Sequence, residues 1–176
     1  MIDIIAPGST VVDMFACVGN LSIPMAVYKP VQVIGIEINP LAFKYLSRNI
    51  QRNKIEARYQ PLLGDNRERT PTNWADHVIM GCWDCDARQI LRGIEALKVK
   101  DGGWIHFHEV VPPNQQTSAL RRFNAVLECS PSNLTVMESR PRRVKGVGPR
   151  LSHMVTDLLL LPVNLADIER GVANSH

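Results

Sequence analysis

The sequence lacks the features that mark membrane and secreted proteins. No apolar run approaches the ~20 residues that a membrane-spanning helix needs, and the N-terminal Met1-Ile2-Asp3 carries no basic flank typical of a signal peptide. There are only 4 cysteines. With no sign of secretion, we expect these cysteines to be free thiols in a reducing compartment. We therefore expect a soluble, cytoplasmic protein without a membrane partner.

The chain also has little net charge. Its 20 basic and 17 acidic residues give a formal net charge of +3, which excludes a chain that is polybasic throughout. A hydrophobic content of 45% and a charged content of 21% are normal for a globular protein. At 176 residues, without repeats or linkers, the sequence predicts one domain over residues 1–176. It leaves the oligomeric state open.

Strand-like and helix-like segments alternate along most of the chain. The predicted strands cover residues 10–15, 31–38, 57–63, 76–80, 104–111, 134–138 and 153–161, and the predicted helices cover 20–27, 41–54, 87–99 and 114–129, the first with Asn20 as its N-cap. Alternation predicts an α/β fold with a mostly parallel sheet, and the closing pair of strands should be antiparallel. Such a seven-stranded sheet is typical of the Rossmann-like fold of class I S-adenosylmethionine-dependent methyltransferases. We expect the tail after Pro162 to be loosely structured.

The first predicted strand ends in an acidic turn that contains one glycine. Such a turn, at the carboxyl end of a strand in an open α/β sheet, brings backbone N–H groups close to a nucleoside cofactor. Glycine allows the ligand to approach the backbone closely. We therefore take Asp13, Phe15 and Gly19 as candidate cofactor-binding residues. The dinucleotide fingerprint needs three glycines, which argues against a nicotinamide cofactor. An ordinary strand-to-helix turn is the alternative interpretation.

Polar side chains also follow the next two predicted strands. Glu37 closes the second, and its carboxylate suits two ribose hydroxyls because it accepts two hydrogen bonds at once. Its alternative role is to cap the helix that begins at Pro40. Asp65 and Asn66 follow the third strand and suit the amino group and ring nitrogen of an adenine, although alone they would indicate an Asx turn. The carboxyl ends of these strands meet at one crevice, where ligands bind in such sheets.

In combination, these motifs resemble a family of tRNA-modifying enzymes. Asp-Met-Phe-Ala-x-x-Gly followed by Leu-Ser-Ile-Pro, then Ile-Glu-Ile-Asn-Pro-x-Ala, then Gly-Asp-Asn-Arg, is similar to the catalytic domain shared by two branches. One branch holds the tRNA guanine N1-methyltransferases that act next to the anticodon. The other holds the wybutosine-synthesising enzymes that transfer an aminocarboxypropyl group. The resemblance covers roughly residues 9–162.

The finer resemblance favours the aminocarboxypropyltransferase branch. Gly64-Asp65-Asn66-Arg67 and His106-Phe107-His108 resemble that branch, and Met80-Gly81-Cys82-Trp83 stands where the methyltransferase branch carries an Asn-Leu-Pro type sequence. The resemblance implies transfer of the 3-amino-3-carboxypropyl group of S-adenosylmethionine to a tricyclic guanosine in phenylalanine tRNA, a step of wybutosine biosynthesis. Such a displacement depends mostly on orientation, so we name no catalytic residue.

The resemblance also implies roles for the candidate residues. It carries over Glu37, Asp65 and Asn66 as cofactor contacts, with Asp13 and Gly19 in the cofactor loop, and it implies no metal. The family often has glycine at the position of Cys17, which makes this loop bulkier. The family also carries N-terminal tRNA-binding domains, which we expect to be absent here. We therefore expect this chain alone to bind the cofactor weakly and to transfer poorly.

Three further clusters have ordinary structural interpretations beside functional ones. Cys82 and Cys85 have the spacing of a metal or redox pair, but no second pair follows, and we expect this segment to line the acceptor pocket with Trp83 stacked on a base. His106 and His108 share a strand face and are more often core residues than metal ligands; we expect His108-Glu109 to face the crevice. Basic residues gather at Arg140, Arg142, Arg143, Lys145 and Arg150, with Arg121 and Arg122 nearby in sequence. We favour contact with tRNA phosphates over a solvated loop.

Two alternatives to aminocarboxypropyl transfer stay open at this point. The first is N1-methylation of guanine in tRNA by the same cofactor. The second is a truncated domain that binds cofactor or RNA without turnover.

Overall fold

The computed structural model describes residues 4–112, 114–115 and 117–163 of the chain. Within this part, seven strands form one sheet in the order β3-β2-β1-β4-β5-β7-β6. The tail that we expected to be loosely structured lies, from residue 164 on, outside the described residues. No helix in the described part is long and apolar enough to cross a membrane.

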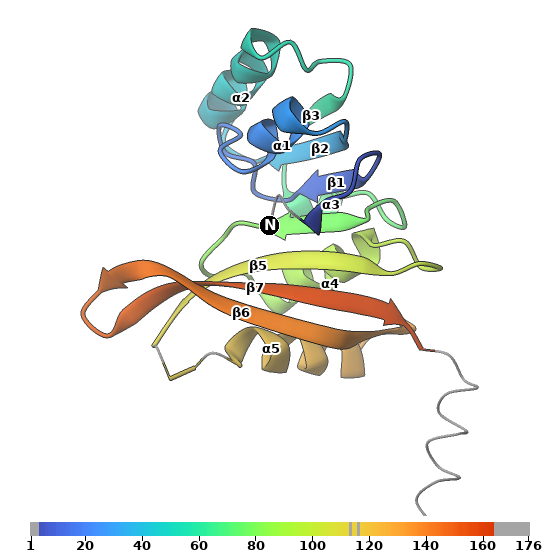
Figure 1. Cartoon of the computed structure of the whole chain (residues 1–176), viewed down its shortest axis with the longest axis vertical. Helices are drawn as coiled ribbons and strands as arrows, with labels where there is room; N and C mark the ends of the chain where they lie inside the picture. The colour runs from blue at the N-terminus through green and yellow to red at the C-terminus, as the bar shows by residue number, and fades with distance from the viewer. Residues whose placement is uncertain (1–3, 113, 116, 164–176) are drawn as a thin grey trace, which may run out of the picture.

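The sheet is parallel except for its closing strands, as predicted. The five parallel strands are β1 (Thr10–Asp13), β2 (Gln32–Glu37), β3 (Tyr59–Leu63), β4 (His77–Met80) and β5 (Gly103–Val111). The last two, β6 (Leu134–Gly148) and β7 (Leu151–Pro162), form an antiparallel hairpin, and β7 pairs antiparallel with β5. The hairpin turn is the outermost part of the sheet in Figure 1, beyond the carboxyl ends of the parallel strands.

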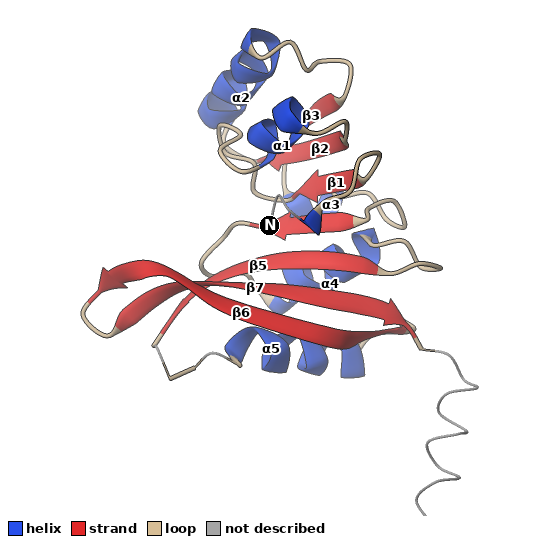
Figure 2. Cartoon of the chain, in the orientation of Figure 1, coloured by secondary structure: helices blue, strands red, loops and turns tan. Residues whose placement is uncertain are grey.

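Helices cover the two faces of the sheet unequally. One apolar core joins the sheet to α4 (Ala87–Ala96) and α5 (Ser118–Glu128), through residues such as Ile90 and Phe123. A second joins it to α1 (Ser22–Tyr28) and α2 (Pro40–Arg52), through residues such as Ile23 and Leu46. Figure 2 shows α1 and α2 beside β2 and β3, and α4 and α5 behind the β5–β7–β6 end.

Three local predictions were wrong. Helix α1 begins at Ser22 after Leu21, so Asn20 is not its N-cap. A short helix, α3 (Asn66–Arg69), follows β3 and was not predicted. The basic segment between the predicted strands 134–138 and 153–161 was not predicted as a strand, but it extends β6 to Gly148 because its backbone pairs with β7 through three register shifts.

Candidate functional site

A cavity of about 270 Å³ lies at the carboxyl ends of β1, β2 and β3. The structure brings four of the six candidate residues into its wall: Phe15, Glu37, Asp65 and Asn66. The other lining residues are Met14, Ile36, Ile38, Gly64, Arg67 and Gln89. Asp13 and Gly19 lie outside the wall and shape the loop that forms one side of it.

The buried carboxyl of Asp13 holds the loop after β1 in place by accepting two hydrogen bonds. Its Oδ1 accepts a hydrogen bond from the backbone N–H of Phe15 at 3.2 Å, and its Oδ2 accepts one from the Ser22 hydroxyl at 2.7 Å. Ser22 also hydrogen-bonds the Tyr59 hydroxyl at 2.7 Å. Asp13 is therefore a positioning residue beneath Phe15, and its side chain is too deeply buried to meet a ligand.

Burial raises the pKa of Asp13 to about 6, although the hydrogen bonds from Ser22 and Phe15 oppose this. Because the unfolded-state pKa is lower, ionisation of Asp13 favours the unfolded chain. Its contribution to the free energy of unfolding falls by about 2 kcal/mol as the pH rises from about 4 to 6. Burial lowers the pKa of both His77 and His108 to about 4. Their titration therefore raises the free energy of unfolding as the pH rises, which is opposite to the effect of Asp13.

The Asp13→Asn variant isolates this effect. We expect the difference in free energy of unfolding between variant and wild type to change by about 2 kcal/mol between pH 4 and 7, in favour of the variant at the higher pH. Urea denaturation at both pH values measures it. A difference in free energy of unfolding that stays constant with pH would contradict the raised pKa of Asp13.

Gly19 allows the loop to turn tightly into α1. Its φ of +95° lies in the left-handed region, and its N–H donates to the Ala16 carbonyl at 2.7 Å. A Cβ at this position would lie 2.3 Å from Cδ1 of Ile23. The backbone conformation and the neighbouring core both require glycine here.

Gly19→Ala is expected to lower the free energy of unfolding by about 1–3 kcal/mol, because alanine is strained at this φ and crowds Ile23. Thermal or urea denaturation measures the loss. Gly8→Ala is a matched control, since Gly8 has a φ of +85° but nothing within 4 Å of its Cβ position. Equal losses in the two variants would show that strain acts without the crowding.

Glu37 joins two backbone segments at the rim of the cavity. Its Oε2 accepts from the N–H of Cys17 at 2.8 Å, and its Oε1 accepts from the N–H of Asn39 at 2.7 Å. The cap of α2 is Asn39, whose side chain accepts from Leu41 and Ala42, and this removes the helix-capping alternative for Glu37. Each carboxylate oxygen keeps a further lone pair for a hydroxyl group.

Asp65 and Asn66 organise the opposite wall. Asp65 caps α3 by accepting from the N–H of Arg67 at 2.9 Å, and it forms an ion pair with the Arg67 side chain. Asn66 donates to the Met14 carbonyl at 3.0 Å and accepts from Gln89 at 3.2 Å. The Asn66 amide therefore ties β1 to α4, and one of its N–H groups remains for a ligand.

The sequence analysis missed several lining residues. Gln89 belongs to the capping box of α4, where it pairs with Asp86. Asp86 also forms an ion pair with Arg67. The capping box is a local motif, but the contacts of Arg67 with Asp86 and of Gln89 with Asn66 join distant parts of the chain, and no local motif predicts them. Ile38 is a large apolar residue directly after β2, and its 65% exposure, which suits contact with a ligand, is known only from the structure.

The wall has the chemistry that an adenosine moiety requires. Phe15, Ile36 and Ile38 offer apolar surface to a flat base, and Glu37 offers a carboxylate to ribose hydroxyls. Gly64, at a φ of +141°, gives backbone access between Glu37 and Asp65. The residues present therefore fit a nucleoside cofactor. Within the described residues, no group of three or more His, Cys, Asp or Glu side chains could hold a metal.

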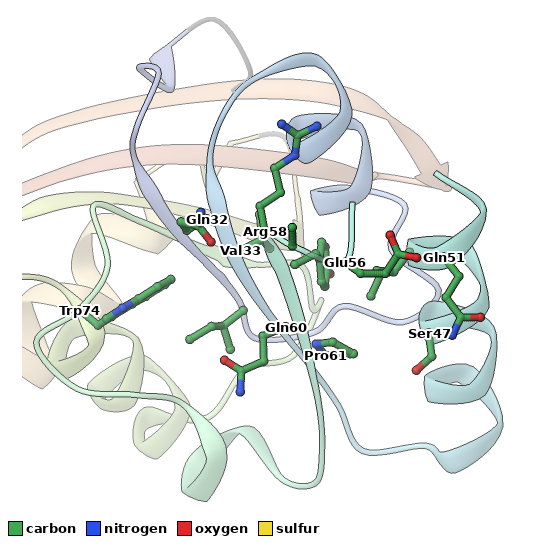
Figure 3. Close-up of a pocket in the computed structure, with 13 residues that line it drawn as sticks. Gln32, Val33, Ser47, Gln51, Glu56, Arg58, Gln60, Pro61 and Trp74 are labelled. Carbon is green, nitrogen blue, oxygen red and sulfur yellow. The ribbon is translucent and has the colours of Figure 1, made fainter. Parts of the chain in front are cut away.

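A groove of about 480 Å³ lies elsewhere, along the edge strand β3 (Figure 3). Gln32, Arg58 and Trp74 belong to it, at the amino-terminal side of the parallel strands. None of the candidate site residues lines this groove. Because ligands in such sheets bind at the carboxyl ends of strands, we do not take it as the cofactor site.

Two expectations about the β4–β5 region were wrong. Cys82 and Cys85 form a disulfide rather than two free thiols, whereas Cys17 and Cys129 are free. Glu109 does not face the crevice: it is buried, and it accepts a hydrogen bond from the Ala119 N–H of α5 at 3.1 Å. Burial raises the pKa of Glu109.

The comparisons with known proteins point to one family. The model of the TRM5/TYW2 methyltransferase domain family matches residues 1–137. The tRNA(Phe) (4-demethylwyosine(37)-C(7)) aminocarboxypropyltransferase of Pyrococcus horikoshii is 35% identical over 167 residues, which cover 90% of this chain and 56% of that protein. This chain therefore spans little more than half the length of that curated relative.

Two solved structures represent the two branches. The structure of M. jannaschii TYW2 in complex with AdoMet has a TM-score of 0.84 at 32% identity, and the match covers 92% of this chain and 73% of that one. The structure of the M. jannaschii tRNA m1G37 methyltransferase has a TM-score of 0.74 at 28% identity, over 92% of this chain and 47% of that one.

Proposed function

This chain belongs to the TRM5/TYW2 methyltransferase domain family, and from that premise we propose that it is an S-adenosylmethionine-dependent tRNA transferase. We propose that it moves the 3-amino-3-carboxypropyl group to a tricyclic guanosine next to the anticodon of phenylalanine tRNA, a step of wybutosine biosynthesis. On this proposal its partner is a tRNA, and the enzyme works in the cytoplasm, where cell fractionation should find it.

One observation carries the choice of transferred group. The relative that matches 90% of this chain is named an aminocarboxypropyltransferase, and the M. jannaschii TYW2 structure is more similar in fold than the m1G37 methyltransferase, with TM-scores of 0.84 and 0.74. The sequence after β4 agrees, since Gly81-Cys82-Trp83 replaces the Asn-Leu-Pro type sequence of the methyltransferase branch.

The residues of the cavity have distinct tasks in this reaction. Glu37 would hold the ribose, while Phe15 and Ile38 would contact the base of the cofactor. Asp13 keeps the loop in place through Phe15 and Ser22. When bound, S-adenosylmethionine supplies a sulfonium-activated carbon; transfer breaks its C–S bond, forms a bond to the acceptor base, and releases a proton and 5′-methylthioadenosine. The protein contributes mainly by fixing the two reactants in line.

The products of the reaction test the proposal. We would incubate the chain with S-adenosylmethionine and phenylalanine tRNA that carries the tricyclic guanosine, then analyse digested nucleosides by mass spectrometry. Aminocarboxypropyl transfer adds about 101 Da and methylation about 14 Da to the acceptor. The co-product is 5′-methylthioadenosine in the first case and S-adenosylhomocysteine in the second.

The alternatives predict different results. A gain of about 14 Da on guanosine would establish the methyltransferase function instead. Binding of both ligands with no product would favour a binding domain, provided that a full-length relative forms product under the same conditions.

A further inference from the structure

One face of the β5–β7–β6 end of the sheet, here called the open face, carries none of the described helices, although several of its side chains are buried. Helices α4 and α5 pack on the other face, and Figure 2 shows none of the described helices in front of these three strands. The strand register places a polar set on the open face. On β5 and β7 it includes His106, His108, His153 and Asp157, and on β6 it includes Arg140, Arg142 and Lys145.

His108 and His153 form a pair with unused hydrogen-bonding capacity. Nδ1 of His108 lies 3.1 Å from Nε2 of His153, so these two atoms share one proton. His108 is only 7% exposed, and its Nε2 and the Nδ1 of His153 are buried without a hydrogen-bond partner. In either tautomer of two neutral rings, the pair presents one unpaired donor and one unpaired acceptor. Buried groups of this kind are costly unless a ligand satisfies them.

An exposed aromatic ring borders this pair. Trp83, in the loop after β4, is 57% exposed, and its ring centre lies 6.1 Å from that of His153 at an angle of 53°. A large exposed indole beside a donor and an acceptor has the features of a binding site for a flat heterocycle. We call this site, formed by Trp83, His108 and His153, the base seat. The imidazoles suit a base edge better than a phosphate, since burial lowers the pKa of both and keeps them neutral.

Cations suited to phosphates lie directly beside this seat. Residues 139–156 contain five basic and no acidic residues. Arg142 and Lys145 are exposed, and in the register of β6 and β7 Lys145 lies opposite His153 and Arg142 opposite Val155. Arg142 has only a long contact, 3.8 Å, with Asp157. Among the described residues, Lys145 forms no ion pair. These charges are therefore available to an anionic ligand.

The seat and the cofactor cavity open at the same edge of the sheet. Met80, the last residue of β4, pairs with Phe107, so His108 lies one residue beyond the end of β4. β4 lies between β1 and β5 in the sheet, so β5 lies two strand spacings, about 10 Å, from the loop that borders the cavity. This separation is about the size of a nucleoside.

We propose that Trp83, His108 and His153 hold the acceptor base, and that Arg142 and Lys145 hold the phosphates that flank it. The proposal deepens the function proposed above, because it assigns the second substrate of that reaction to the open face. The ligand class is a single nucleotide turned out of an RNA loop, read by stacking and by its base edge.

The phosphate part is tested by binding of a fluorescent anticodon stem–loop of phenylalanine tRNA. The Arg142→Ala/Lys145→Ala variant should bind at least tenfold more weakly, with the slope of log K against log salt reduced by about 1.5, as for two lost contacts to single-stranded phosphates. Arg52→Ala/Lys54→Ala is the matched control, because it removes two exposed charges from the C-terminal end of α2. Equal losses in both variants, or an unchanged slope, would overturn the phosphate assignment.

The base part is tested with the same stem–loop that carries an abasic site at the acceptor position. Trp83→Ala and His153→Ala should each weaken binding of the intact RNA about tenfold, but should leave binding of the abasic RNA unchanged. Equal losses for both RNAs, or no loss for either, would overturn the base seat. These titrations need no turnover, so they stand apart from the product analysis: a methylated product would refute the proposed reaction without affecting the subsite.

Discussion

Replacing Glu37 by glutamine is expected to weaken S-adenosylmethionine binding about ten- to hundredfold. Hydrogen bonds to a charged group contribute about 1.5–3 kcal/mol each, and tenfold in affinity corresponds to about 1.4 kcal/mol. Glutamine would also turn its NH₂ group toward one of the two backbone N–H groups, of Cys17 or Asn39, that the carboxylate now accepts. The variant therefore loses both ligand contacts and the alignment of the loop.

Isothermal titration of wild type and variant with S-adenosylmethionine measures this loss. Glu56→Gln is the control, since Glu56 is an exposed carboxylate in the groove of Figure 3, away from the cavity. Denaturation of both variants separates lost binding from lost folding. Equal affinity of Glu37→Gln and wild type would refute Glu37 as a cofactor contact.

Asp157→Ala is expected to cost about 3 kcal/mol of the free energy of unfolding. The Asp157 carboxyl accepts from buried His106 at 2.6 Å, and His106 contacts His77 at 3.2 Å. Burial opposes ionisation of Asp157 most strongly, but the hydrogen bond from His106 and the charges of His106 and Arg142 together outweigh it and hold the pKa of Asp157 below its usual value. Removing the carboxylate leaves a buried imidazole N–H without a partner, and breaking a buried network of this kind is strongly destabilising.

Urea denaturation near pH 7 measures the loss. Glu138→Ala is the matched control on the neighbouring strand, because its ion pair with Arg140 is exposed and contributes little to stability. Since the pKa of Asp157 is lowered, its stabilisation is present above the unfolded-state pKa and is lost as the pH falls below about 4. A loss no larger than that of the control would show that the buried pair does not hold β5 to β7.

The alternation of strands and helices was readable from the sequence because its causes are local. Side chains repeat with period 2 in strands and near 3.6 in helices, so residues within one element reveal it. The acids at strand ends were readable for a related reason: the carboxyl ends of parallel strands meet at one edge, so Glu37 and Asp65 had to approach each other. Both line the same cavity.

The basic segment shows where local patterns failed. Residues 139–148 contain Pro141, Gly146 and Gly148 beside several arginines, a composition that favours a loop. Pairing with β7 supplies the backbone hydrogen bonds that make this segment a strand, and register shifts accommodate the glycines. This partner lies in a different stretch of sequence, so no local window contains the reason.

The sequence by itself determined the sheet, its closing antiparallel pair and the edge at which a nucleoside cofactor should bind. Only the tertiary structure decided which side chains complete the two candidate sites. Gln89 reaches Asn66 across 23 residues, His108 reaches His153 across 45, and His106 reaches Asp157 across 51. Such contacts depend on strand order and register, which the whole chain sets by burying both faces of the sheet, and a linear motif carries no record of them.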